Sequence, residues 1–310
     1  MAKPGKYGDW IATAPQSPRS PAPRLRLFCV APVGMSGACF HTWVSNLPEE
    51  VEIMPLELPG RGFRMGEKLE SSSLDKLAAA ALNGLGEGLF NEMPFVIFGH
   101  SFGAWLAYEL TQQILKRGWA RPEKLYVSAN RAPQLHGTQH DPDCTQPELA
   151  GLDEESFWKH FERRYGLNPD LQSDYIRGFV RPILQGDFAL LETYKPSSLQ
   201  PLPVPLCALC AKGDARCRTQ QLTAWSDVAG AGFQERWFEN VWKNEFWATE
   251  HRYIIDNPES LLRFLSQDLP LVGGSVNGYA GVDGPMPPDD IPPSASVGQD
   301  AESGRRCHIS

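Results

Sequence analysis

A serine between two glycines is the residue of this chain best placed to do chemistry. Ser101 stands in the pattern Gly99-x-Ser101-x-Gly103, after the apolar run 94–97 and before the amphipathic stretch 104–115. A chain that turns sharply from a strand into a helix leaves no room for bulky residues beside the turn, which accounts for both glycines. The turn would hold the hydroxyl clear of the sheet at a helix N-terminus, where the helix dipole favours negative charge. The pattern therefore predicts a nucleophilic serine in an elbow.

The acid of the predicted site is Asp214. A serine hydroxyl needs a general base, and the base needs a group that orients it. In chains with this elbow the acid follows the serine and a histidine follows the acid. Asp214 stands just after the strand-like run 204–211, where a side chain projects over the carboxyl edge of a parallel sheet. Asp227 falls in a helix-like stretch and Asp187 in a helical insertion, and both fit less well.

His251 is the expected base, because it follows Asp214 within the part of the chain that has a folded composition. His100 adjoins the nucleophile and would point away from it. Other histidines precede the acid or stand in the C-terminal tail, namely His136, His140, His160 and His308. Ser101, Asp214 and His251 thus have the types and the chain order of a catalytic triad.

Two backbone N–H groups must stabilise the oxyanion that forms when the serine attacks a carbonyl group. In this type of site the residue after the nucleophile supplies one of them, here Phe102. A loop after an early strand supplies the other, and residues 31–36 follow the first strand-like run. Within that loop we expect the Val33 N–H to be the second donor.

Strand-like and helix-like segments alternate along most of the chain. The strand-like runs are short, apolar and bounded by Gly or Pro, and they cover residues 24–30, 51–56, 94–98, 124–129, 204–211 and 233–239. The helix-like segments cover residues 73–89, 104–117, 220–228 and 258–265. Runs of this kind are typical of parallel strands buried on both faces. The alternation predicts the α/β class, with a mostly parallel, doubly wound sheet.

The alternation stops between about residues 147 and 193, where helix-like segments carry many aromatic side chains. Large apolar residues recur there at spacings that could line one face: Trp158, Phe161, Tyr165, Tyr175, Phe179, Phe188 and Leu190. They either pack against the sheet or form a helical lid over a lipid-like substrate. We favour the lid, because the insertion would lie just above the elbow.

Composition limits the classes of function. The chain has 310 residues, 42% of them hydrophobic, and a formal net charge of -8 without a basic block, which argues against nucleic acid as a partner. No apolar run reaches about 18 residues, so we expect no membrane span. The first twenty residues have no apolar segment of the kind that a secretory signal needs. We expect a cytoplasmic protein, although the basic residues before the first strand are also compatible with a transit peptide.

We expect three parts along the chain. Residues 1–23 form an N-terminal extension, and residues 24–270 form one catalytic domain with its lid at about 137–195. In residues 271–310 Gly, Pro, Ser and Asp dominate and the apolar periodicity ends, which predicts a disordered tail.

The seven cysteines are expected to be mostly reduced, because no secretory signal is evident. Cys207 and Cys210 form a C-x-x-C pair with Cys217 nearby, a spacing that zinc sites and redox pairs also have. The pair falls inside a strand-like run and no second C-x-x-C pair exists. Cysteine in such a run behaves as a small buried hydrophobe, so we expect neither a metal nor another cofactor.

Several further motifs occur in a recognisable order. They are Leu27-Phe-Cys-Val-Ala-Pro-Val-Gly34, Trp43, Leu58-Pro-Gly-Arg-Gly62, Phe98-Gly-His-Ser-Phe-Gly-Ala104 and Gly186-Asp-Phe-Ala-Leu-Leu-Glu-Thr-Tyr194. From about Trp10 to Leu265 the chain resembles type II thioesterases, stand-alone α/β-hydrolases that serve polyketide, nonribosomal-peptide and fatty-acid synthases. The resemblance implies an α/β-hydrolase fold that hydrolyses acyl thioesters held on the phosphopantetheine arm of a carrier protein. Ser101 would be acylated, His251 would transfer protons and Asp214 would orient His251.

The chain departs from this family at two places. The family usually has Ala-Gly-Gly in the oxyanion loop, where this chain has Val33-Gly34-Met35 and so more bulk beside the acyl group. The family's histidine usually follows a glycine, whereas Glu250 precedes His251. The Glu250 carboxylate either raises the pKa of the imidazole or points to solvent.

Two alternative functions remain. One is an esterase or coenzyme A thioesterase of the same fold, and the other is a non-catalytic acyl-binding protein.

Basic residues are the candidates for contact with an acidic carrier or with the phosphate of its arm. They are Arg61, Arg64, Lys159, Arg163 and Arg164. Arginine suits phosphate recognition, and ordinary solvated surface is the alternative for each residue.

The sequence finishes Arg305-Arg-Cys-His-Ile-Ser310, which matches a prenylation box on Cys307 except that His308 is not aliphatic. The box functions only in a eukaryote. One prenyl chain with two arginines would give weak, reversible membrane attachment.

Overall fold

One parallel sheet forms the centre of the domain. The computed structural model describes residues 8–12, 22–69, 72–142, 147–239 and 250–271. The strands of the sheet are β1 (Leu25–Val30), β2 (Val51–Pro55), β3 (Phe95–His100), β4 (Lys124–Ser128), β5 (Leu206–Ala211) and β6 (Phe233–Phe238). Each strand falls on one of the strand-like runs of the sequence, so the predicted fold class is confirmed.

The order of the strands places the elbow at a crevice. Neighbouring strands pair in parallel in the order β2-β1-β3-β4-β5-β6. Every residue of β1, β3 and β5 is buried, which explains their continuous apolar sequences. The strand order reverses between β1 and β3, and the carboxyl ends of strands at such a point form a ligand crevice. Ser101 follows β3 and the loop 31–36 follows β1, so the topology brings both to this crevice.

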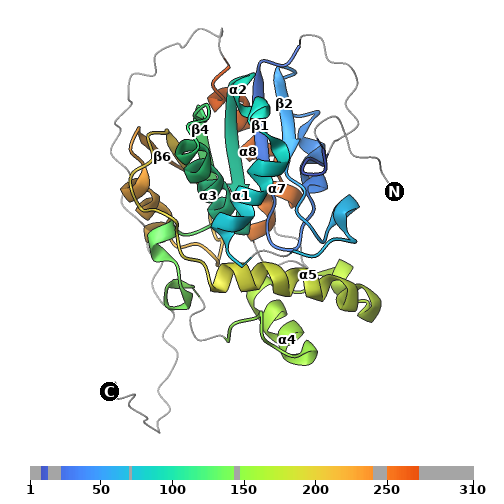
Figure 1. Cartoon of the computed structure of the whole chain (residues 1–310). Helices are drawn as coiled ribbons and strands as arrows, with labels where there is room; N and C mark the ends of the chain where they lie inside the picture. The colour runs from blue at the N-terminus through green and yellow to red at the C-terminus, as the bar shows by residue number, and fades with distance from the viewer. Residues whose placement is uncertain (1–7, 13–21, 70–71, 143–146, 240–249, 272–310) are drawn as a thin grey trace, which may run out of the picture. The chain divides into compact units, whose positions relative to one another are not determined.

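Helices cover both faces of the sheet. Figure 1 shows α1 and α3 side by side on one face and α8 on the other. The helices that flank the sheet or connect its strands are α1 (Leu74–Leu85), α2 (Gly88–Asn91), α3 (Phe102–Lys116), α6 (Thr219–Thr223), α7 (Tyr253–Asp256) and α8 (Glu259–Asp268). Short 3-10 helices lie at η1 (Gly37–Trp43), η2 (Gly62–Arg64), η3 (Pro133–Leu135), η4 (Thr138–His140), η5 (Pro169–Leu171), η6 (Ala224–Val228) and η7 (Glu250–Arg252). Over the described ranges, no helix is both long and apolar enough to cross a membrane.

The insertion between β4 and β5 is helical. Its two longer helices, α4 (Glu154–Tyr165) and α5 (Asp174–Glu192), lie together across one end of the sheet (Figure 1). They share a separate apolar cluster with the segment before α4, made of Leu149, Phe157, Trp158, Leu184 and Phe188. This cluster packs partly buried aromatic residues of α4 against α5, so the insertion has a small core of its own.

Two of the aromatic residues predicted for the apolar face of this insertion do not lie on it. Tyr175 is 84% exposed and Phe179 is 44% exposed. Residues four apart share one face of a helix, and here that face is turned to solvent, whereas Leu184 and Phe188 face α4. The prediction was therefore wrong for Tyr175 and Phe179, because spacing alone does not tell which face of a helix is covered.

The two glycines of the elbow are required by close backbone approach. A Cβ atom on Gly99 would lie 2.0 Å from the Gly103 carbonyl oxygen, and one on Gly103 would lie 2.2 Å from the Val30 carbonyl oxygen. Neither obstacle is a flexible side chain that could move away. The start of α3 therefore packs directly on the ends of β1 and β3, as the sequence pattern predicts.

Replacement of Gly103 by alanine tests this contact. Gly103→Ala should lower the free energy of unfolding by about 1–3 kcal/mol or more. The new methyl group overlaps backbone atoms that cannot move away. Gly178→Ala is the matched control, since nothing lies within 4 Å of its Cβ position on α5. That change should leave stability equal or slightly higher, because alanine favours a helix by about 0.5–1 kcal/mol over glycine. Denaturant unfolding measures both, and equal stabilities would contradict the close packing.

Candidate active site

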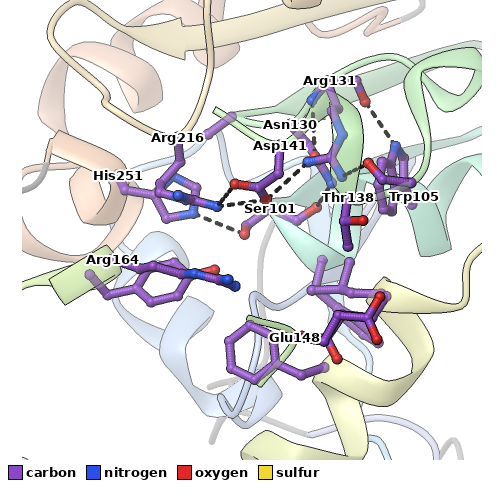
Figure 2. A pocket seen from close by; sticks show the side chains of 17 residues that line it. Ser101, Trp105, Asn130, Arg131, Thr138, Asp141, Glu148, Arg164, Arg216 and His251 are labelled. Atoms are coloured by element: carbon purple, nitrogen blue, oxygen red, sulfur yellow. Dashed lines mark hydrogen bonds and ion pairs between the residues drawn. The ribbon is translucent and has the colours of Figure 1, made fainter. Parts of the chain in front are cut away.

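Ser101 has a backbone conformation that residues with side chains rarely adopt. It is the N-cap of α3, with φ 56° and ψ −121°. Its N–H donates to the Ser128 carbonyl oxygen at 2.7 Å, and Asn130 Nδ2 donates to the Ser101 carbonyl oxygen at 2.8 Å. Such strain persists only where the surroundings over-determine it, and it is common at functional sites. The turn directs the hydroxyl toward His251 (Figure 2).

The structure brings the three predicted residues together in one hydrogen-bonded line. His251 Nε2 lies 2.9 Å from Ser101 Oγ, and His251 Nδ1 lies 2.9 Å from Asp214 Oδ2. Ser101 stands between β3 and α3, Asp214 follows β5, and His251 lies in η7. The carboxylate accepts a hydrogen bond from the Nδ1–H group. The neutral imidazole therefore carries its proton on Nδ1 and presents an unprotonated Nε2 to the serine hydroxyl. A histidine in this position can act as the general base for the hydroxyl.

Asp214 is held as a carboxylate. Its burial raises its pKa, but the His251 ring and its hydrogen bond, together with the Arg216 backbone N–H, outweigh burial, so the net pKa lies below its ordinary value. The Arg216 N–H donates to Oδ1 at 2.8 Å, and the Cys210 thiol lies 3.7 Å from Oδ2. With both carboxylate oxygens engaged, the acid cannot easily rotate away from the imidazole.

His100 supports the base through its main chain. Its Nε2 lies 2.7 Å from the His251 carbonyl oxygen and its Nδ1 lies 2.8 Å from Ser128 Oγ. A carbonyl oxygen only accepts, so Nε2 carries the proton and Nδ1 accepts from the serine hydroxyl. Ser128 Oγ in turn accepts from Tyr253 Oη at 2.6 Å, and burial raises the pKa of that tyrosine. The sequence predicted that His100 would not be the base, and gave no sign of this chain of hydrogen bonds.

Two backbone N–H groups near Ser101 are suited to an oxyanion. Within the described ranges, neither the Phe102 N–H nor the Val33 N–H has a hydrogen-bond partner. Their neighbours in the loop are occupied, because the Gly34 N–H donates to Asp187 Oδ2 at 2.7 Å and the Met35 N–H donates within the loop at 3.2 Å. The loop and Ser101 line the same cavity. In the described part of the chain both N–H groups are therefore unoccupied beside Ser101, and their role as oxyanion donors stays a prediction.

An ion pair between distant parts of the chain holds this loop. Arg61 donates to both oxygens of Asp187, at 2.8 and 2.6 Å, and the two side chains are 3% and 0% exposed. The same carboxylate accepts the Gly34 N–H. Arg61 belongs to the Leu-Pro-Gly-Arg-Gly motif and Asp187 to the Gly-Asp-Phe motif, so both motifs support the oxyanion loop.

Arg61 and Arg64 are not surface residues, contrary to the prediction that they contact a carrier or its phosphate. Arg61 is committed to Asp187. Arg64 is 7% exposed, donates to Glu67 and to the Glu57 carbonyl oxygen, and packs over the Trp10 ring at 4.1 Å. A guanidinium group that is enclosed and paired cannot bind an incoming phosphate without breaking these contacts.

Two cavities meet at Ser101 and His251. One has a volume of about 270 Å³ and is bounded by the oxyanion loop and by apolar residues of α4 and α5, among them Phe161, Val180 and Leu184. The other, of about 60 Å³, extends past Trp105 and Asn130 toward arginine and acidic side chains, and is the one seen in Figure 2. The insertion contributes walls to both, which is the position expected of a lid.

The comparison with known proteins decides the family. The model of the thioesterase domain matches residues 25–269. This chain belongs to the thioesterase family. The curated thioesterase PikA5 of Streptomyces venezuelae is 31% identical over 219 residues, which make up 70% of this chain and 73% of that protein. The gramicidin S biosynthesis protein GrsT of Aneurinibacillus migulanus is 26% identical over 253 residues, which make up 81% of this chain and 91% of that protein.

Solved structures agree. RedJ, a thioesterase from the prodiginine biosynthetic pathway in Streptomyces coelicolor, is 29% identical with a TM-score of 0.68, over 84% of this chain and 91% of that chain. The resemblance seen in the sequence is therefore confirmed, and the α/β-hydrolase architecture with it.

Ion pairs hold the polar cavity of this thioesterase in shape. Asp141 accepts from Arg216 at 2.7 Å and lies 3.5 Å from Arg131 (Figure 2). Arg131 also lies over the Trp105 ring, 4.8 Å from its centroid. These contacts join the loop of the acid, next to Asp214, to the segment that leads into the lid.

Other residues of the sequence analysis have plain positions in the thioesterase. Glu250 is buried and its carboxylate lies 2.9 Å from where a Cβ of Gly213 would be, so it does not point to solvent. Cys207 and Cys210 are buried in β5. Cys307 lies outside the described residues, and its prenylation stays a prediction.

Loss of the charge on Asp187 should destabilise the thioesterase. Asp187→Asn leaves Arg61 buried without a counter-ion, which we expect to lower the free energy of unfolding by about 3–5 kcal/mol. Glu67→Gln is the matched control, because its ion pair with Arg64 has one side chain 47% exposed and should contribute less than about 1 kcal/mol. Denaturant titration measures both, and equal losses would contradict the central place of the Arg61–Asp187 pair.

His100 should give the thioesterase a distinct acid sensitivity. Burial, with the neighbouring His251 imidazole, lowers the pKa of His100 to about 3. An unfolded chain binds this proton below its ordinary pKa of about 6.5, so stability should fall as the pH drops from about 6.5 toward about 3. His100→Asn should be less stable at neutral pH. Over that pH range the free energy of unfolding of the variant should nevertheless fall less steeply than that of the wild type. The difference between the two slopes should be about 1.4 kcal/mol per pH unit. Unfolding curves at several pH values measure the slopes, and identical slopes would refute the assignment.

Proposed function

We propose that this chain is a type II thioesterase that hydrolyses acyl thioesters held on the phosphopantetheine arm of a carrier protein. The observation that carries the proposal is the Ser101–His251–Asp214 line, with both hydrogen bonds at 2.9 Å, at the meeting point of an apolar and a polar cavity. Its relatives support the substrate class, because PikA5 is a thioesterase and GrsT takes part in gramicidin S biosynthesis.

The first half of the reaction acylates the serine. His251 Nε2 takes the proton of Ser101 as Oγ attacks the thioester carbonyl carbon, and negative charge moves to the carbonyl oxygen. The Phe102 and Val33 N–H groups stabilise that charge. The carbon–sulfur bond then breaks, His251 returns the proton to the departing thiol, and the acyl group stays on Ser101 as an ester.

The second half releases the acid. His251 takes a proton from a water molecule, whose oxygen attacks the acyl-serine carbonyl carbon, and the same two N–H groups again stabilise the oxyanion. The ester bond breaks and the proton returns to Ser101 Oγ. Asp214 stays ionised throughout and stabilises the imidazolium that forms twice in the cycle. The phosphopantetheine arm belongs to the substrate, so the steps need only residues of this chain, the substrate and one water molecule.

The chemistry of the two cavities supports an assignment of the substrate's two arms. The larger cavity is lined by apolar residues of the lid and suits the acyl chain. The smaller cavity is lined by polar residues, and the Thr138 hydroxyl group among them suits an amide group of the pantetheine arm. The exposed Lys159 and Arg163 of α4 are candidates for contact with an acidic carrier.

Replacement of the nucleophile tests the proposal. Ser101→Ala should lower turnover of an acyl-carrier thioester by about 10⁴–10⁶-fold while the fold stays intact. Ser45→Ala, at an exposed serine, is the control and should keep full activity. A fluorophosphonate probe should label the wild type and Ser45→Ala but not Ser101→Ala. Substantial hydrolysis by Ser101→Ala would show that the nucleophile is another residue.

The substrate class needs its own comparison. The same acyl group presented on a carrier protein, on coenzyme A and as a simple ester should be hydrolysed fastest from the carrier, judged by kcat/KM. Equal values would overturn the role of the carrier protein. They would favour an esterase or coenzyme A thioesterase with the same triad.

A further inference from the structure

Tyr165 separates the two cavities. The linings of the apolar and the polar cavity share Ser101 and His251, which react, and one other residue, Tyr165. This tyrosine is the last residue of α4, and Gly166 with φ 79° ends the helix directly after it. The ring therefore lies where the lid reaches the reacting atoms, between the two spaces into which the substrate's arms extend.

The ring is held in place from several sides. Its centroid lies 5.1 Å from that of Phe161 and 6.0 Å from that of Phe188. The Arg216 guanidinium carbon lies 5.3 Å from the ring centroid, and the His251 ring centroid lies 6.1 Å away. Lid residues, the loop of the acid and the base thus surround one ring, which makes it a fixed wall and not a mobile surface group.

The hydroxyl group of Tyr165 is not needed for this wall. Within the described ranges it has no hydrogen-bond partner, and burial raises its pKa, so it stays neutral. Removal of the hydroxyl and removal of the ring are therefore separable changes. The first leaves the wall, and the second joins the cavities.

We propose that the Tyr165 ring determines how much bulk the enzyme accepts on the carbon next to the thioester carbonyl. The inference rests on the proposed function, since it concerns the same acyl substrate. During attack the carbonyl carbon must lie about 3–3.5 Å from Ser101 Oγ. The next carbon then lies beside the His251–Tyr165 wall. An unbranched chain can run into the apolar cavity, whereas a branch on that carbon meets the ring.

This wall differs from a limit on chain length. The length of the acyl chain is limited by residues along the apolar cavity, such as Val180 and Leu184. These residues line the apolar cavity but not the polar one. Tyr165 lies at the reacting end, where the position of the carbonyl group leaves the substrate no freedom to shift. Its effect should therefore fall on branching and leave the preferred length unchanged.

A pair of matched substrates tests the proposal. Hexanoyl and 2-methylhexanoyl groups on one carrier protein are compared by kcat/KM with wild type, Tyr165→Ala and Tyr165→Phe. The wild type should prefer the unbranched substrate. Tyr165→Ala should reduce that preference by about 10-fold or more, the effect of one methyl group in a fitted pocket. Tyr165→Phe should leave it within about twofold, because the wall is kept.

Phe157→Leu is the control for a loosened lid. Phe157 is fully buried in α4 and contacts Phe161 and Phe188, but lines neither cavity. It should lower stability without a change in the branching preference. An unchanged preference in Tyr165→Ala, or an equal loss on both substrates, would overturn the inference. If the wild type hydrolyses neither carrier-bound substrate, the proposed function fails instead, and fluorophosphonate labelling shows whether Tyr165→Ala has kept a competent serine.

Discussion

The turn at Ser101 is the constraint on which the rest of the site depends. A positive φ at a residue with a side chain is unfavourable, and here it is enforced on both sides. Glycines let α3 touch the ends of β1 and β3. The Ser101 N–H donates to a carbonyl oxygen of β4, and Asn130 donates to the Ser101 carbonyl oxygen, so both peptide groups are fixed. Since the turn joins β3 to α3, Ser101 is positioned by a strand that is buried at every residue.

The oxyanion loop depends on a second constraint that only the folded chain reveals. Asp187 lies on the lid helix α5, yet its carboxylate is bound by Arg61 from the loop after β2 and by the Gly34 N–H of the loop after β1. Asp187 therefore connects the lid to the oxyanion loop near the C-terminal end of the lid. A lid that moved as a whole would have to break this buried ion pair, which is costly.

Much of the site could be predicted from the sequence, because its signals are local. Short apolar runs mark buried parallel strands, and the elbow, the acid after β5 and the later histidine follow from chain order. What could not be predicted depends on partners far apart in the chain. Arg61 and Arg64 look like surface residues until Asp187 and Glu67 are placed beside them. His100 looks redundant until the His251 carbonyl group is found at its Nε2. Tyr175 and Phe179 have the spacing of core residues, and only packing shows that their face is open.

The hydrogen bond from His100 to the His251 carbonyl oxygen has a mechanical consequence. His251 is 150 residues from Ser101 along the chain, so the chain itself does not fix the distance between them. Its main chain, however, is fastened to the residue that directly precedes Ser101. Small distortions of the sheet therefore move Ser101 and His251 together. The distance between Ser101 Oγ and His251 Nε2 then changes little when other parts of the domain move.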